Sequence, residues 1–259
     1  MEFRILGPVE VVHGGEPVRL DGPRQERVLA MLLINRGRLV TIEALVDVVW
    51  PSNPPVTATN QVQNSVTALR RKLCGLGMPE SGLVRKGAGY LLTIPDDQFD
   101  AAHYLALIRQ GRLLARSGNT ARAIRTLRRA EDLWCGPALA GLPGDALAFQ
   151  SEAVRLEEIR LQALEERLVL EVNLGRHHEC LAELAGLARG YPLREGLQGA
   201  LMLALHRCGR SAEALEVYDR AQRRLAEEFG LEPSAGLRRL RQLVLSERQC
   251  SSLAGFLPA

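Results

Sequence analysis

The chain has 259 residues, a formal net charge of +3, 46% hydrophobic residues and 24% charged residues. This is ordinary globular composition, with enough length for two domains. The longest apolar run, from Val28 to Ile34, is far shorter than the ~20 residues of a membrane-spanning helix. The N-terminal residues also lack the pattern of a signal peptide, so we expect a cytoplasmic protein with no membrane partner.

The cysteines and the charges narrow the possible functions further. The five cysteines are odd in number and widely spaced, which predicts buried thiols in a reducing compartment rather than disulfides or a zinc site. The segment 60–95 carries five basic residues against the single acid Glu80, whereas the rest of the chain is nearly neutral. A local basic patch on a nearly neutral chain favours a defined nucleic-acid footprint.

The first part of the chain predicts strands followed by helices. "FRILGPVEVV" alternates apolar and polar residues, and "HGGE" supplies a turn before "PVRL", which together predict a short antiparallel sheet. Pro23 suits the first position of a helix that ends near Gly37. "RLV" then predicts a short strand, Thr41 an N-cap for the helix "IEALVDVVW", and Thr57 an N-cap for the next helix.

The helix "NQVQNSVTALRRKL", from Asn60 to Leu73, has two distinct faces. Its apolar residues form one narrow stripe at the helical period, which predicts a face docked on a core. The opposite face holds amide, hydroxyl and guanidinium groups and no acid. Asn and Gln can bond the edge of adenine and Arg that of guanine, so this face is typical of a recognition helix, although a polar face that merely lacks acids is the competing interpretation.

A predicted β-hairpin, "GLVRKGAGYLL", follows this helix. Sheet, helices and hairpin in this order indicate a winged helix-turn-helix domain, with Arg85 and Lys86 at the tip of the wing. Tyr90 follows the bend at Gly89, so we expect it in the core rather than stacked on a base. The segment Ile94–Asp100 is the expected domain boundary, and we expect it to be a mobile linker.

The remainder predicts only amphipathic helices. "GRHHECLAEL" from Gly175 aligns with "GRSAEALEVY" from Gly209 at an offset of 34 residues, the tetratricopeptide period, and "GNTARAIRTL" from Gly118 is a weaker third copy. We therefore predict an α+β winged helix-turn-helix domain at 1–95, an all-α tetratricopeptide-like repeat domain at 96–248, and a disordered tail at 249–259.

The sequence contains no recognisable catalytic or cofactor motif. Phosphate-loop, GxSxG and HExxH patterns are missing, so we expect neither an enzyme nor a cofactor. His177, His178 and Cys180 are close in sequence, but a closed metal site needs four ligands, and the aligned repeat has Ser211, Ala212 and Ala214 there. We interpret the three residues as the start of a helix and part of its core, with no metal.

These residues resemble the Streptomyces antibiotic regulatory proteins (SARPs). "FRILGPVEV", "GPRQERVLAMLL", "LRRKL" and "GAGYLL" are similar to the OmpR-type winged-helix half of that family. "LWCGPALAGLP", "RLEEIRLQALEERL" and "CGRSAEALEVYDRAQRRLAEEFGLEPSAGLRRL" are similar to its bacterial transcriptional activator domain. The resemblance spans roughly residues 1 to 248 and includes both domains in order.

The resemblance implies a transcriptional activator of a secondary-metabolite gene cluster. It would bind direct repeats in double-stranded promoter DNA near the −35 element, together with a second copy of itself, and recruit RNA polymerase through its sigma factor and alpha subunit. The implied base-reading residues are Asn60, Gln61, Asn64, Thr67 and Arg71. The implied phosphate contacts are Arg24, Thr59, Arg70, Lys72, Arg85 and Lys86. Two alternatives are a repressor that uses the same DNA face and a helical-repeat scaffold that binds no DNA.

Overall fold

A computed structural model describes residues 1–142 and 146–246. The predicted tail at 249–259 lies outside the described residues. The described chain divides into two compact units, one of Met1–Arg109 with Arg129–Arg160 and the other of Gln110–Arg128 with the residues from Leu161 onward. Helices α4 (Asp100–Arg116) and α6 (Leu147–Asn173) each contribute residues to both units. The boundaries of these compact units differ from those of the predicted domains 1–95 and 96–248. The two domains therefore stay a prediction from the sequence.

The first unit begins with a three-stranded antiparallel sheet of β1 (Glu2–Arg4), β2 (Glu10–His13) and β3 (Glu16–Pro17). Phe3 pairs with Val11, so the run "FRILGPVEVV" folds back on itself instead of forming one strand. The break falls at Gly7 and Pro8, because proline lacks the N–H that a continuous strand would need. Gly14 and Gly15 form the predicted turn, both with positive φ.

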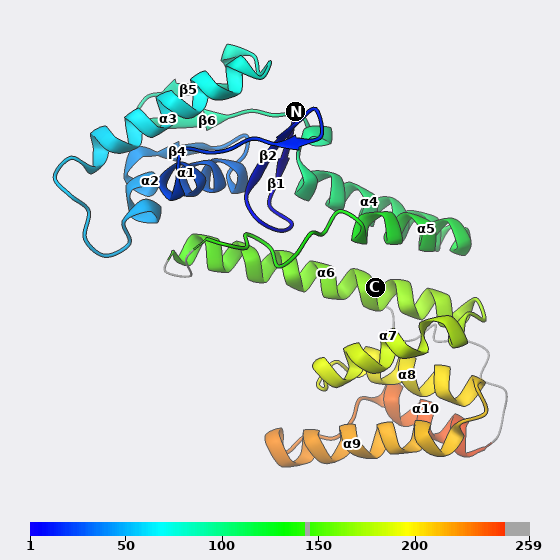
Figure 1. The fold of residues 1–259 in the computed structure, drawn as a ribbon. Helices are drawn as coiled ribbons and strands as arrows, with labels where there is room; N and C mark the ends of the chain where they lie inside the picture. The colour runs from blue at the N-terminus through cyan, green and yellow to red at the C-terminus, as the bar shows by residue number, and fades with distance from the viewer. Residues whose placement is uncertain (143–145, 247–259) are drawn as a thin grey trace. The chain divides into compact units, whose positions relative to one another are not determined.

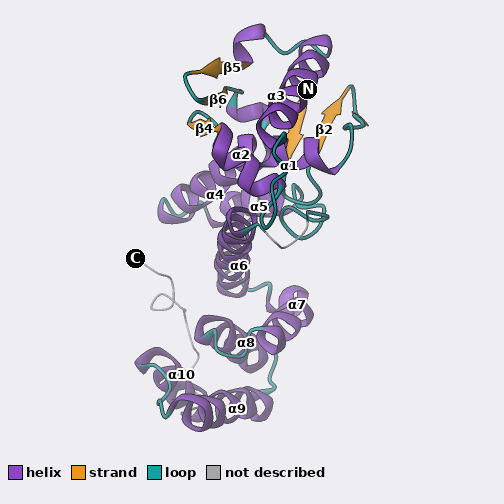
Figure 2. Ribbon diagram, turned by 90° about the vertical axis from the view of Figure 1, so that its left-hand side faces the viewer, coloured by secondary structure: helices purple, strands orange, loops and turns teal. Residues whose placement is uncertain are grey.

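Three helices and a second small sheet complete the winged helix-turn-helix part. The helices are α1 (Pro23–Ile34), α2 (Ile42–Val49) and α3 (Ala58–Gly75), and each packs against the other two. The second sheet has the order β4 (Leu39–Thr41), β6 (Gly89–Leu92) and β5 (Leu83–Lys86). Figure 2 shows the two sheets on opposite sides of the three helices. The α+β winged helix-turn-helix prediction is confirmed.

The helix caps follow the sequence only in part. The Thr41 hydroxyl accepts a hydrogen bond from the Ala44 N–H at 3.1 Å, as predicted for the N-cap of α2. Thr57 also occupies the N-cap position of α3, but its side chain makes no capping bond. Its hydroxyl accepts instead from the Gln61 side chain at 2.8 Å. Thr57 is therefore the N-cap residue of α3, as predicted, but its hydroxyl does not accept a hydrogen bond from a backbone N–H of the first turn.

The segment Ile94–Asp100, expected to be a mobile linker, is anchored within the first unit. Arg36 forms an ion pair with Asp96 at 2.7 Å, donates to the Ile94 carbonyl at 3.2 Å and lies over the Phe99 ring. The Asp100 carboxylate accepts from the backbone N–H groups of Ile5 and Leu6 at 2.9–3.0 Å. The linker expectation is wrong because these contacts involve residues far away in sequence, which a local pattern does not reveal.

The N-terminal strands also depend on residues that follow the winged part. The N–H groups of Cys135, Leu139 and Ala140 donate to the carbonyls of Leu6, Ile5 and Gly7 respectively, at 2.8–2.9 Å. In addition, a Cβ on Gly7 would lie 3.1 Å from the Cys135 Cβ, so the two backbones approach closely there. The segment 129–160 therefore contributes directly to the first unit.

The helical part consists of repeated helical hairpins. After α4 and α6, the remaining helices are α5 (Thr120–Glu131), α7 (His177–Gly190), α8 (Glu195–Arg207), α9 (Ser211–Phe229) and α10 (Ala235–Leu245). Figure 1 labels them along the chain. Gly118, Gly175 and Gly209 all have positive φ, and each precedes the start of a helix by two residues. The glycines of the predicted repeat are thus required by the turns between helices.

The small residue shared by the three repeats is a core position. Ala123, Cys180 and Ala214 are each at most 2% exposed. Burial raises the pKa of the Cys180 thiol to about 11, so this side chain behaves as a small apolar group. The tetratricopeptide-like prediction is confirmed in its period and its core.

Candidate nucleic-acid interface

Helix α3 divides into the two faces that its sequence predicts. Val62, Val66, Leu69 and Leu73 are at most 2% exposed and pack into the core of the winged helix-turn-helix part. On the other side Thr59, Asn60, Asn64, Thr67, Arg70 and Arg71 are all exposed. Because the apolar stripe is fully buried, the polar face is held outward over about three and a half turns of helix. This is the geometry by which a recognition helix enters a major groove.

The arginines on this face are available for a ligand. Neither the Arg70 nor the Arg71 side chain makes a hydrogen bond or an ion pair with any residue that the structure describes. The Thr67 hydroxyl donates to the Gln63 carbonyl at 2.8 Å, which fixes its orientation and leaves its oxygen free to accept. An unpaired guanidinium on a helix without acids is a strong donor for guanine edges and phosphates.

Gln61, by contrast, is already engaged within the protein. Its side-chain oxygen accepts from the Arg24 guanidinium at 2.6 Å, while its nitrogen donates to Thr57. The Arg24 guanidinium also lies 5.3 Å from the centroid of the Trp50 ring. Arg24 is thereby held at the N-terminal ends of α1 and α3, where an anion is also attracted by the helix dipoles. Gln61 orients Arg24 in this arrangement, and its base-reading role stays a prediction.

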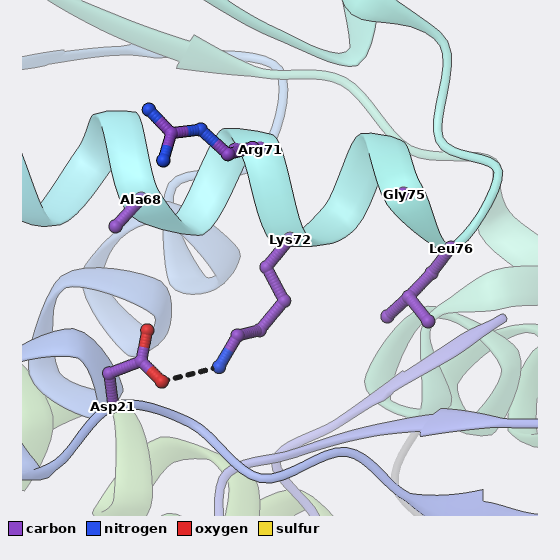
Figure 3. Close-up of a pocket in the computed structure, with 6 residues that line it drawn as sticks. All are labelled: Asp21, Ala68, Arg71, Lys72, Gly75 and Leu76. Carbon is purple, nitrogen blue, oxygen red and sulfur yellow. Dashed lines mark hydrogen bonds and ion pairs between the residues drawn. The ribbon is translucent and has the colours of Figure 1, made fainter.

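Lys72 makes contacts that differ from those of its neighbour Arg71. Its ammonium donates to the Asp21 carboxylate at 2.6 Å and to the Arg19 carbonyl at 2.7 Å. Figure 3 shows Lys72 extending from α3 to Asp21, while Arg71 points away from that carboxylate. The hydrogen bond from Lys72 lowers the pKa of the exposed Asp21. Lys72 therefore fastens α3 to the loop before α1, and its predicted phosphate contact would require it to leave this ion pair.

The hairpin of β5 and β6 forms the wing. Arg85 pairs with Tyr90 and Lys86 with Gly89 across its two strands, and both basic side chains are exposed. Tyr90 is 7% exposed, so it belongs to the core as predicted. A Cβ on Gly89 would lie 2.2 Å from the Val40 carbonyl oxygen, which makes glycine necessary where β6 meets β4. The wing is thus fixed at its base and carries two cations near its turn.

The sequence did not reveal the residues that support this surface. Trp50 supplies the ring beneath Arg24, and Asp21 supplies the partner of Lys72. Arg27 donates to the carbonyls of Val48 and Val49 and so caps the C-terminal end of α2. All of these contacts join residues that are far apart in the sequence, so no periodicity or spacing could have indicated them.

Two family models match the chain. "Transcriptional regulatory protein, C terminal" matches residues 15–92, and "Bacterial transcriptional activator domain" matches residues 99–245. The chain belongs to the SARP family. A SARP is a DNA-binding transcription regulator and not an enzyme, which agrees with the exposed face of α3.

The SARP assignment is supported by individual relatives. The chain is 39% identical over 246 residues to regulatory protein AfsR of Streptomyces coelicolor, covering 95% of this chain and 24% of AfsR. It is 33% identical over 251 residues to regulatory protein DnrI of Streptomyces peucetius, covering 95% of this chain and 92% of DnrI. The structure of Mycobacterium tuberculosis EmbR in complex with a low affinity phosphopeptide matches with a TM-score of 0.92 at 33% identity, covering 98% of this chain and 67% of that one.

The chain thus spans about a quarter of AfsR and nearly all of DnrI. In the described part of this SARP, none of the helices combines the length and apolar character needed to span a bilayer.

Proposed function

We propose that this SARP activates transcription of a secondary-metabolite gene cluster by binding direct repeats in the promoter and recruiting RNA polymerase. The observation that carries the proposal is the exposed, acid-free face of α3, whose opposite apolar stripe is buried. The family assignment supports the regulatory role, and the resemblance described above supports the direct repeats, the −35 position and the contact with the sigma factor and alpha subunit.

The residues divide by role in this proposal. Asn60, Asn64 and Arg71 project from the exposed face of α3 and read base edges in the major groove. Arg70 and Thr59 contact phosphates beside the groove, and the wing reaches the neighbouring backbone. Arg24, oriented by Gln61 and Trp50, contacts a phosphate near the N-terminal end of α3.

Footprinting of the purified protein on promoters of the neighbouring gene cluster tests DNA binding. We expect protection of two repeats in the same orientation, and we expect Arg71→Ala to lose that protection. Arg239→Ala is the matched control, because Arg239 is an exposed arginine on α10, in the other compact unit. Absence of protection on every promoter would favour the interaction scaffold.

Transcription in vitro with purified RNA polymerase holoenzyme tests the direction of regulation. We expect more transcript from the protected promoter when the protein is added. A decrease in transcript with an intact footprint would identify a repressor that uses the same DNA face.

A further inference from the structure

The turns before α7 and after α8 bring two histidines and a cysteine together. His177 and His178 begin α7, and Cys208 follows the last residue of α8. One ligand atom from each side chain lies within 4.8 Å of the other two. The Cys208 sulfur is 3.4 Å from the His178 Nδ1, and the centroids of the His177 and His178 rings are 4.7 Å apart.

The cysteine beside the histidines in the folded chain is Cys208, whereas the cysteine close to them in the sequence is Cys180. Cys180 is 2% exposed, and its sulfur lies 3.8 Å from the His177 carbonyl oxygen. The group of close ligand atoms contains Cys208 instead. Cys208 reaches the histidines because equivalent turns of consecutive helical hairpins lie side by side in a repeat stack. Each turn contains one of the glycines that are 34 residues apart, Gly175 and Gly209.

We propose that His177, His178 and Cys208 form a binding site for a borderline-soft divalent transition metal of the zinc type. Two imidazole nitrogens and one thiolate are ligands that zinc prefers. In a tetrahedral zinc site neighbouring ligand atoms are about 3.3–3.7 Å apart, given bond lengths of about 2.0–2.3 Å. The distance of 3.4 Å between the Cys208 and His178 atoms already lies in this range.

A second observation points to a ligand at this cluster. The His177 Nδ1 is buried, and among the described residues it has no hydrogen-bond partner. A buried polar atom without a partner is costly, whereas a reorientation of the ring that lets one nitrogen bind a metal and the other reach a hydrogen-bond acceptor would remove that cost. A plain hydrogen bond between the Cys208 thiol and His178 leaves the His177 nitrogen unexplained.

Two arginines lie close to Cys208 in the sequence, and both are bonded to other groups. Arg210 follows Cys208 by two residues and is held by two hydrogen bonds of 2.6 Å to Glu213. Arg207 donates to the Val172 carbonyl at the end of α6. The thiolate is the form of cysteine that binds a metal ion. The fourth position remains for water or for a side chain of a partner protein.

A metal here would hold together the two ends of the helical hairpin formed by α7 and α8. It would join the start of α7 to the end of α8, two helices that pack against each other. Since the ligands reach this geometry only in the folded chain, metal binding stabilises the fold. The inference concerns the helical part alone and does not depend on the proposed function at the promoter.

The test uses the whole 259-residue chain, reduced and free of metal. Titration with Co²⁺ should produce a sulfur-to-cobalt charge-transfer band with a stoichiometry of about one ion per chain, as expected for one N₂S site. Saturating Zn²⁺ should raise the melting temperature by about 5 °C or more. Both effects should be lost in Cys208→Ser and kept in Cys135→Ser, which removes an exposed cysteine in the other compact unit.

Mapping of cysteine alkylation by mass spectrometry supplies a test on the unaltered chain. Zn²⁺ should slow the alkylation of Cys208 and leave that of Cys74 and Cys135 unchanged. A cobalt band that survives in Cys208→Ser, or protection of another cysteine instead, would place the metal elsewhere and overturn the proposal. Absence of the band in the wild-type chain would also overturn it.

Discussion

Arg71 and Lys72 are neighbours on α3, but their side chains make different contacts. Arg71 is exposed without a partner among the described residues, whereas Lys72 is held by Asp21 and by the Arg19 carbonyl. Sequence periodicity predicts which side of the helix each residue occupies, and it placed both near the exposed face. The partner of Lys72 lies 51 residues earlier in the chain, so its engagement could not be predicted from local pattern.

Arg71→Ala should weaken binding to the cognate repeat by roughly 1–3 kcal/mol, because a bidentate contact to guanine is lost. The same change should relax the preference at one base position, measured by fluorescence anisotropy on a set of single-base operator variants. Arg239→Ala is the control for a general loss of positive charge. Equal weakening on cognate and scrambled DNA would show that Arg71 contacts a phosphate rather than a base.

Arg85→Ala in the wing should act differently from Arg71→Ala. A phosphate contact carries no sequence information, so affinity should fall on every sequence to a similar extent. The slope of log K against log salt should become shallower by about one unit, because one fewer counterion is released. Binding isotherms at several salt concentrations measure this slope, and an unaltered slope would remove the wing tip from the interface.

At the scale of elements, local signals predicted the helices and the hairpin well. The apolar stripe of α3 and the glycines before α5, α7 and α9 are short-range patterns, and each was found where it was predicted. The N-terminal sheet was only partly predicted, because the pairing of Phe3 with Val11 depends on the break at Gly7 and Pro8. The anchoring of the Ile94–Asp100 segment was missed because Asp100 bonds to Ile5, which lies 95 residues away.

Gly89→Ala tests how firmly the wing is joined to the rest of the sheet. The added Cβ would meet the Val40 backbone, so β6 must move away from β4. We expect a loss of stability of about 1–3 kcal/mol, which is typical of overpacking against a rigid neighbour. Denaturant unfolding measures it. Gly75→Ala is the matched control, because a Cβ there meets no atom within 4 Å and alanine is the better helix former. Similar losses in the two variants would argue against a rigid junction at Gly89.

At the scale of the whole molecule, Asp100 links the residues just after the first strand to the start of α4. Its carboxylate accepts hydrogen bonds from the backbone of Ile5, Leu6 and Ala101, yet burial dominates and raises its pKa from 3.8 to about 6. A raised pKa means that the folded protein binds this proton more tightly than the unfolded chain does. The stabilisation is therefore complete below about pH 4 and is lost as the pH rises through about 6.

The free energy of unfolding should accordingly carry a pH-dependent contribution from Asp100 of about 3 kcal/mol at most between pH 4 and pH 7. Asp100→Asn cannot titrate, so the stability difference between wild type and variant should change over this interval, with the wild type gaining relative stability at low pH. Urea unfolding at a series of pH values measures the difference. A constant difference would show that Asp100 has an ordinary pKa in the folded protein.

The arrangement of two copies on DNA is the last consequence of this architecture. One winged domain reads one short half-site, and two copies on direct repeats would lie head to tail. A two-fold dimer could bind repeats in the same orientation only if one winged domain rotated about the Ile94–Asp100 segment. This segment is anchored by Arg36 and by the backbone of Ile5, so we expect no such rotation. We therefore expect half-sites about one helical turn apart, ~10–11 bp, and cooperation through unlike surfaces of the two copies.

Insertion of DNA between the repeats tests this arrangement by electrophoretic mobility shift and by transcription in vitro. Five inserted base pairs turn the second half-site by about half a turn, so cooperative binding and activation should both collapse. Insertion of a full turn should restore much of the binding, because the second half-site returns to the same side of the duplex. Strong cooperative binding with the half-turn insertion, or a preference for inverted repeats, would falsify the head-to-tail arrangement and would leave α3 as the recognition helix.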